Sequence, residues 1–143
     1  MRVTGNERGQ LIFHGAAVLF VGLLCGLVAV AEEAAKSLPQ VWRAAHSALL
    51  LAGVWLLTTG AIFPHLVLAP REKAGLIWSL LATAYGFTTA VTVQAATGVR
   101  AIGPGESPAT VVAFAGNVVA VVGGLLAGLL TLAGAWAALK RGE

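Results

Sequence analysis

Charged residues are scarce in this sequence. Only 10% of its 143 residues are Asp, Glu, Lys or Arg, whereas an ordinary soluble domain is about a quarter charged. Hydrophobic residues make up 58%, and the mean hydropathy is +0.87. A chain this apolar has no polar coat with which to face water, which excludes a soluble domain. The net charge of +3 comes from bases at the ends of apolar runs, without interleaved aromatic residues, so we expect no nucleic acid partner.

Cysteine is almost absent, and so are charged groups inside the apolar runs. The single cysteine, Cys25, cannot form an internal disulfide or a cysteine-based metal cage, so we expect it to pack as a small hydrophobic residue. No carboxylate or base lies deep in any apolar run. This argues against a proton-coupled pump or an ion-coupled carrier, which usually need a buried carboxylate. It also leaves no carboxylate pair, no Ser-His-Asp set and no phosphate-binding loop.

Long hydrophobic runs are what the sequence does contain. A helix needs about 20 apolar residues to cross the hydrocarbon core of a bilayer. We therefore predict an all-α, integral membrane four-helix bundle, a single transmembrane domain with a multi-pass topology in the cell inner (plasma) membrane. Its expected spans are residues 11–31, 44–63, 76–97 and 109–139. The first run is too long for the core of a cleavable signal peptide, and we interpret it as the first span.

The basic residues predict the orientation of these spans. The N-terminus, the second loop and the C-terminus hold six bases, whereas the first and third loops hold three. The positive-inside rule then places both termini in the cytoplasm. The six are Arg2, Arg8, Arg71, Lys73, Lys140 and Arg141, and the three are Lys36, Arg43 and Arg100.

Small residues recur at helical spacing in two of the spans. Helices in lipid associate through close packing of such residues, because lipid gives no hydrophobic drive for helix against helix. We predict seams that pack either within the bundle or between subunits. They consist of Gly22 and Gly26 in the first span and of Gly116, Ala120, Gly124 and Gly128 in the fourth.

Histidines are the candidate ligands at membrane depth. His14 and His65 lie near the cytoplasmic ends of their segments, where an interfacial or hydrogen-bonded role is expected. His46 lies inside the extracytoplasmic end of the second span. Gly53 follows two turns along the same face, with Ala52 beside it, and this leaves room for a flat ligand next to the imidazole. The alternative is a structural histidine that is hydrogen-bonded near the interface.

The third span carries a stripe of hydroxyl groups. Its members are Tyr85, Thr88, Thr89 and Thr92, spaced like one helical face. Such a stripe either satisfies its own helix backbone or lines a cavity. Two amide side chains, Gln94 and Asn117, also need partners within the bundle.

Several short motifs resemble a known family, the small four-span membrane isomerases that include styrene oxide isomerase and hydroxylaminobenzene mutase. The resemblance covers nearly the whole chain. It is carried by His14-Gly15 with Gly22-Leu23-Leu24-Cys25-Gly26, by Trp42-Arg43-Ala44-Ala45-His46-Ser47, by Tyr85-Gly86, and by Ile102-Gly103-Pro104-Gly105 before a long fourth span rich in small residues.

The resemblance implies a cofactor, a reaction and an assembly. Members of this family hold haem b on the second-span histidine and assemble as trimers, so His46 would be the metal ligand and Trp42, Arg43 and Gly53 would lie beside the cofactor. Ferric haem would act as a Lewis acid that converts a small aromatic epoxide to an aldehyde or rearranges an N-aryl hydroxylamine. The expected partners are a small lipophilic aromatic substrate, membrane lipid and further copies of the chain.

One position departs from the family pattern. An Asn is expected six residues after the ligand histidine, and this sequence has Ala52 there. Tyr85, Thr88 and Asn117 are the residues expected to supply the missing polar group as catalytic residues. Two other functions stay open, a non-catalytic haem-binding or electron-transfer protein and a cofactor-free small-molecule carrier.

Overall fold

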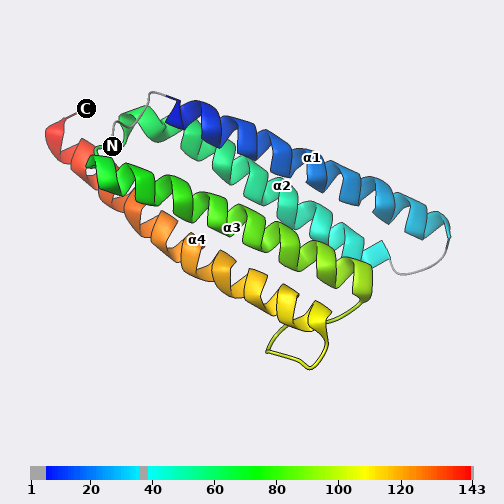
Figure 1. The fold of residues 1–143 in the computed structure, drawn as a ribbon. Helices are drawn as coiled ribbons and strands as arrows, with labels where there is room; N and C mark the ends of the chain where they lie inside the picture. Colours follow the sequence, from blue (N-terminus) through cyan, green and yellow to red (C-terminus); the bar gives the residue numbers. More distant parts are fainter. Residues whose placement is uncertain (1–5, 36–38, 143) are drawn as a thin grey trace.

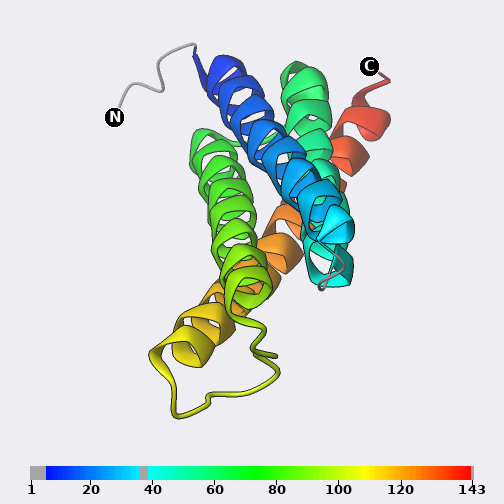
Figure 2. The same cartoon turned by 90° about the vertical axis from the view of Figure 1, so that its right-hand side faces the viewer.

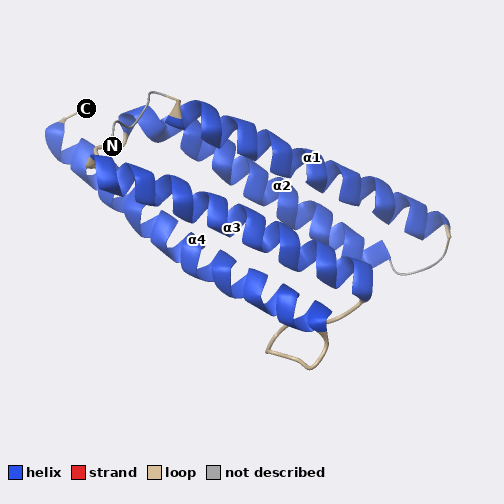
Figure 3. Cartoon of the chain, in the orientation of Figure 1, coloured by secondary structure: helices blue, strands red, loops and turns tan. Residues whose placement is uncertain are grey.

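The computed structural model describes residues 6–35 and 39–142, and within them it contains four long helices and no strand (Figures 1 and 3). These are α1 (Glu7–Ala34), α2 (Pro39–Ile62), α3 (Pro70–Thr97) and α4 (Pro108–Arg141), with a short 3₁₀ helix, η1 (Phe63–His65), after α2. All four are long and apolar enough to cross a membrane. The all-α prediction is confirmed, and each expected span lies within one helix or, for the second, within α2 and η1.

Proline and glycine mark where the helices begin and end. Three helices, α2, α3 and α4, begin at a proline. Its fixed φ suits the first turn of a helix, and its lack of an N–H group costs nothing there, because N–H groups of the first turn have no acceptor within the helix. Gly98 ends α3 with a φ of 70°, a left-handed conformation that glycine adopts without strain. Ser107 caps α4, since its hydroxyl accepts a hydrogen bond from the Thr110 N–H at 3.1 Å.

The bundle consists of two tightly packed hairpins. Helix α1 packs mainly on α2, and α3 packs mainly on α4. In the first hairpin, a Cβ atom at Gly15 would lie 3.1 Å from the Gly53 carbonyl oxygen. In the second, a Cβ atom at Gly116 would lie 2.6 Å from the Gly86 carbonyl oxygen. Glycine therefore brings the helix backbones into direct contact in both hairpins, as expected for helices in lipid.

The seam on α4 differs from the predicted one in its second half. Gly116 and Ala120 are buried, as expected, but the seam continues through Gly123 and Ala127. Gly128 has nothing within 4 Å, and the nearest atom to Gly124 is 3.6 Å away. The physical reason is the helical period of 3.6 residues, because a strict repeat of four drifts off the contact face within three turns.

Helix α4 is the longest and runs obliquely across the bundle (Figure 2). Its 34 residues span about 51 Å, more than the roughly 30 Å of a hydrocarbon core. It begins beside α3, and farther along Gly134 packs against Leu66 and Leu68, with its carbonyl oxygen accepting from the Val67 N–H. This length and tilt carry α4 from one hairpin toward the other.

The buried core is aliphatic. Its largest fully buried side chains are Leu11, Val18, Leu49, Leu56, Leu76 and Leu80, together with Thr59. Cys25 is buried among them as a free thiol, as predicted. Many other large apolar side chains point outward, as expected where lipid or another subunit covers the surface.

Orientation in the membrane gives a first prediction. Figure 1 shows the start of α1, the end of α4 and the α2–α3 connection at one end of the bundle, which brings together the segments richest in bases. (Arg2 and Lys36 lie outside the described residues.) A reporter fused after the C-terminus and active only in the cytoplasm should therefore be active. Activity from a periplasmic reporter alone would reverse the orientation and move His46 to the cytoplasmic side.

Candidate functional site

The imidazole of His46 lies between α2 and α1. Its Nδ1 atom is 2.8 Å from the backbone carbonyl oxygen of Gly22. A carbonyl oxygen only accepts hydrogen bonds, so Nδ1 must carry the proton and donate it. The neutral ring then keeps its lone pair on Nε2, and this is the state in which a histidine binds a metal while its other nitrogen is held by a backbone carbonyl.

Two glycines of α1 make room for this ring. Gly22 lets α1 approach α2 closely, because a Cβ atom there would lie 3.1 Å from the Cβ atom of Leu49. A Cβ atom at Gly26 would lie 2.7 Å from Nδ1 of His46 and 2.9 Å from its Cε1. The pair predicted as a helix-packing motif therefore also forms the seat of the His46 ring.

The donor set around His46 is a single imidazole. Among residues 6–35 and 39–142, no three His, Cys, Asp or Glu side chains lie together in a way that would hold an ion. A haem needs only one protein ligand, because the macrocycle supplies four nitrogen ligands itself. The free Nε2 atom of His46 meets that requirement.

Gly53 does not provide the expected space for a flat ligand. A Cβ atom there would lie 2.6 Å from Cγ of Leu19 and 2.9 Å from the Gly15 carbonyl oxygen. Helix α1 therefore fills the space beside Gly53. The expectation of an open slot along α2 is corrected, because the small residue serves helix packing within the chain.

Trp42 and Arg43 lie at the start of α2 and point to different surroundings. Trp42 lines a cleft between α2 and α3. Arg43 forms an ion pair with Glu33 near the end of α1, and both side chains are more than half exposed. An exposed pair of this kind contributes little to stability. The Arg43 guanidinium, which was expected beside the cofactor, is thus bound to the Glu33 carboxylate instead.

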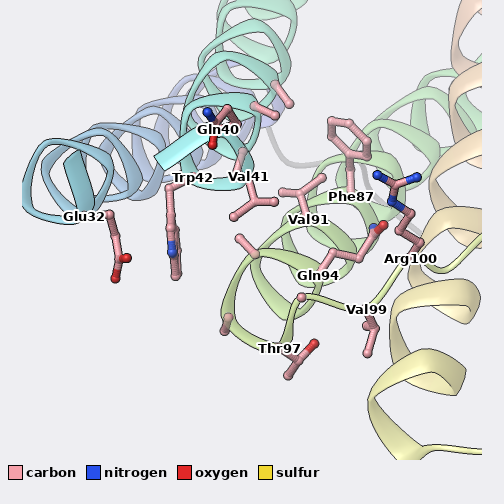
Figure 4. A pocket seen from close by; sticks show the side chains of 16 residues that line it. Glu32, Gln40, Val41, Trp42, Phe87, Val91, Gln94, Thr97, Val99 and Arg100 are labelled. Atoms are coloured by element: carbon pink, nitrogen blue, oxygen red, sulfur yellow. The ribbon is translucent and has the colours of Figure 1, made fainter. Parts of the chain in front are cut away.

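The cleft has a volume of about 1030 Å³, at the upper end of the range for ligand pockets. Figure 4 shows Trp42 and Val41 on one side and Phe87 and Val91 on the other, with the polar Gln94 and Arg100 at the α3 side. Its α2 wall includes Ala44, Ala45 and Ala48, so it lies at the same depth as His46 but on a face of α2 roughly opposite to the one that carries the imidazole. His46 itself does not line it.

Two threonines of the stripe on α3, Thr88 and Thr92, satisfy their own helix. The Thr88 hydroxyl donates to the Ala84 carbonyl oxygen at 2.7 Å, and the Thr92 hydroxyl donates to that of Thr88 at 2.6 Å. Both bonds are of the i−4 type that threonine commonly makes inside helices. Thr88 was expected to be catalytic, but its proton is already donated within α3.

Asn117 and Gln94 hold the loop between α3 and α4. The side-chain N–H of Asn117 donates to the Ala101 carbonyl oxygen at 3.2 Å, and the Gln94 side-chain oxygen accepts from the Ala101 N–H at 3.5 Å. Ala101 is buried as a result. The two amides thus find the partners they needed, and Asn117, expected to be catalytic, is placed in a structural contact.

Tyr85 has its hydroxyl close to a histidine from the other hairpin. Its Oη atom lies 2.6 Å from Nδ1 of His14, and the two rings meet edge to face with centroids 5.6 Å apart. Tyr85 is 43% exposed, so part of this side chain faces the surface of the chain. The hydrogen-bonded role expected for His14 is confirmed, whereas its partner was not foreseen.

The predicted site residues do not meet at one point in a single chain. Along α1, the contact with Tyr85 at His14 and the contact with His46 at Gly22 are eight residues apart, about 12 Å at the rise of an α-helix. The structure therefore separates a His46 site from a Tyr85 site. Asn117 belongs to neither, because its amide is bonded to the loop.

Comparison with protein families matches residues 7–136 to the family described as styrene oxide isomerase. The match spans most of the chain, including all the motifs that carried the resemblance. The chain belongs to the styrene oxide isomerase family. No curated protein and no solved structure gave a match.

The styrene oxide isomerase assignment makes this a membrane protein of an isomerase family. The departure from the family pattern at Ala52 therefore bears on its function. This residue is partly buried and packs against the apolar core. Its direct neighbours, Leu51 and Gly53, are apolar as well, so no polar side chain next to Ala52 replaces the expected asparagine.

Sequence reasoning did not assign to these sites three residues that the structure brings there. His14 is the partner of Tyr85, and Phe87 and Arg100 line the cleft. Two of them had a usable signal, His14 as a histidine inside the first apolar run and Arg100 as a base directly after the third span. The pairing of His14 with Tyr85 joins residues 71 positions apart, which no periodicity in the sequence can indicate.

The seat of the His46 ring gives a second prediction. Gly26→Ala adds a methyl group that collides with Nδ1, so the ring must turn away from the Gly22 carbonyl oxygen. Losing a partner that orients a ligand costs roughly 10- to 100-fold in metal affinity, and we expect a haem-binding titration to show a fall of at least about tenfold. Gly128→Ala, where nothing lies within 4 Å, is the matched control and should bind as the parent does.

Proposed function

We propose that this member of the styrene oxide isomerase family is a haem-b-dependent enzyme of the cell inner membrane. Its substrate would be a small lipophilic aromatic molecule, either an aryl epoxide or an N-aryl hydroxylamine. The observation that supports the proposal is the hydrogen bond from Nδ1 of His46 to the Gly22 carbonyl oxygen, because it leaves the Nε2 lone pair for a metal. A trimer, implied by the resemblance, is part of the proposal.

Both reactions are isomerisations, so no oxidant, reductant or second substrate is required. For the epoxide, the bond between oxygen and the benzylic carbon breaks and a hydride moves to that carbon from its neighbour, giving an aldehyde. For the hydroxylamine, the N–O bond breaks and a ring C–O bond forms, while the ring loses a proton and nitrogen gains one. Ferric haem, when bound, supplies a Lewis acid for the oxygen atom.

The residues of the chain have three tasks in this proposal. His46 holds the cofactor through Nε2, and the glycine seat on α1 fixes the ring. The cleft between α2 and α3 offers Trp42 and Phe87 as apolar surfaces for an aromatic ring. An apolar surrounding also keeps water away from the carbon that becomes electron-poor, which favours rearrangement over hydrolysis.

The positions of the other histidines argue against an electron carrier with two histidine ligands. The chain has three histidines. His14 is bonded to Tyr85, about 12 Å along α1 from the His46 contact, and His65 lies in η1 beyond the far end of α2. Neither lies beside His46 within the same chain, so His46 is the one histidine of its site that would hold a haem.

The test of this proposal is turnover with a labelled epoxide. Purified protein supplied with ferric haem should convert styrene oxide, deuterated twice on its terminal carbon, to an aldehyde. At short times one deuterium should remain on the aldehyde carbon and one should appear on the benzylic carbon, without hydrogen from solvent. If neither this epoxide nor an N-aryl hydroxylamine is rearranged by the haem-loaded protein, the proposal is wrong.

A further inference from the structure

The contact between His14 and Tyr85 lies outside the His46 site and joins the two hairpins. It links α1 to α3 at an Oη–Nδ1 distance of 2.6 Å. The ring of Phe13 packs edge to face on His14 and is itself 68% exposed. The two polar side chains therefore lie beside an exposed aromatic ring on the outer surface of an apolar chain. Polar groups within membrane spans are costly, so they are candidates for a functional role.

The direction of this hydrogen bond follows from the chemistry of the two groups. A phenol is a better proton donor than a neutral imidazole N–H, and an imidazole nitrogen is a far stronger base than a phenol oxygen. The favoured arrangement is therefore Tyr85 donating its hydroxyl proton to Nδ1 of His14. The hydroxyl proton is then committed to the protein.

This direction decides what Tyr85 offers to a ligand. With its proton held by His14, the phenol oxygen presents only lone pairs, so it accepts hydrogen bonds and does not donate them. An epoxide has no N–H or O–H group and gains nothing from such an oxygen. An N-aryl hydroxylamine carries both an N–H and an O–H.

We propose that His14 and Tyr85 form a specificity site that favours small aromatic molecules carrying an N–H or O–H group over molecules that only accept hydrogen bonds. This inference rests on the proposed function, since it selects the N-aryl hydroxylamine class from the two substrate classes given there. His14 acts as a positioning residue, because it works only through the Tyr85 hydroxyl. Phe13 supplies the apolar contact for the ring of the ligand.

The experiment uses the fact that the chain has a single tyrosine. The full-length protein labelled with 3-fluorotyrosine gives one ¹⁹F resonance, which reports on Tyr85 alone. Three aromatic probes of similar size are titrated: benzyl alcohol, which carries an O–H; acetophenone, which only accepts; and ethylbenzene, which does neither. We expect benzyl alcohol to shift the resonance saturably, with acetophenone binding about tenfold more weakly, the effect of one hydrogen bond.

A variant without the imidazole nitrogen should reverse this preference. In His14→Phe the Tyr85 proton is free, so acetophenone gains a donor and the roughly tenfold difference should disappear. His65→Phe is the matched control and should keep the preference of the parent. The measurement on the parent decides the matter even if His14→Phe does not fold.

Two results overturn the inference. If acetophenone shifts the parent resonance as readily as benzyl alcohol, the Tyr85 proton points outward and the site does not select donors. If no probe exceeds ethylbenzene, there is no site. These results do not decide whether the proposed function is correct, because turnover of the epoxide or the hydroxylamine is measured in a separate experiment on unlabelled protein. Turnover without a donor preference refutes this inference alone, and a donor preference without turnover refutes the enzyme alone.

Discussion

Replacing Gly116 with leucine should disrupt the packing of α3 on α4. The reason is geometric, because even a Cβ atom at this position would lie 2.6 Å from the Gly86 carbonyl oxygen and 3.2 Å from the Ala90 backbone nitrogen. Backbone atoms cannot rotate away as a side chain can, so the helices must separate. We expect a loss of stability of about 3 kcal/mol or more, at the upper end of the cost of overpacking.

The measurement is thermal unfolding in detergent, followed by circular dichroism and by size-exclusion chromatography. Gly128→Leu is the matched control, with the same substitution on the same helix at a position where nothing lies within 4 Å. It should melt as the parent does. Equal melting of the two variants would mean that the close approach of α3 and α4 does not hold the bundle together.

Replacing His46 with alanine should remove the haem. If its Nε2 atom is the protein ligand, the variant loses the bond to iron. Haem affinity should then fall by more than about 100-fold, because mutating a residue that only orients a metal ligand already lowers metal affinity by up to that factor. The Soret band should vanish or shift strongly. The measurement is an absorption titration of the purified protein with ferric haem.

Two further tests make this result specific. Free imidazole should partly restore haem binding to His46→Ala, because the space left by the side chain beside Gly26 admits the small ligand. His14→Ala and His65→Ala should keep their haem, since His14 is bonded to Tyr85 and His65 lies in η1. If the parent binds no haem at all, His46 is a structural residue whose role is its bond to Gly22.

Much of the fold could be predicted from the length of the apolar runs. Each run is at least as long as a bilayer requires, and charges or prolines bound it, so the number and approximate positions of the helices follow from the sequence, although the helices extend beyond the predicted spans. The seam of α4 was only half predicted. Its glycines and alanines are so frequent that the spacing of four and the true helical period pass through many of the same residues, and only packing against Gly86 and Ser79 selects Gly116 and Gly123.

The candidate site was predictable where chemistry is local and not where it depends on distant partners. His46 stood out because an imidazole inside an apolar run is costly. Its bond to Gly22, 24 residues away, could not be read from the sequence, yet it determines which nitrogen is free. The same holds for Asn117, whose amide pointed to function until its contact with the loop at Ala101 was known.

The central claim is that a haem held by His46 drives the isomerisation, and one rate measurement tests it most directly. Haem-supplied parent, His46→Ala, and His46→Ala with added imidazole are compared for conversion of styrene oxide and of an N-aryl hydroxylamine. We predict that the variant loses more than about 99% of the activity, in line with a more than 100-fold loss of cofactor affinity, and that imidazole restores part of it. Undiminished turnover by His46→Ala would contradict the account.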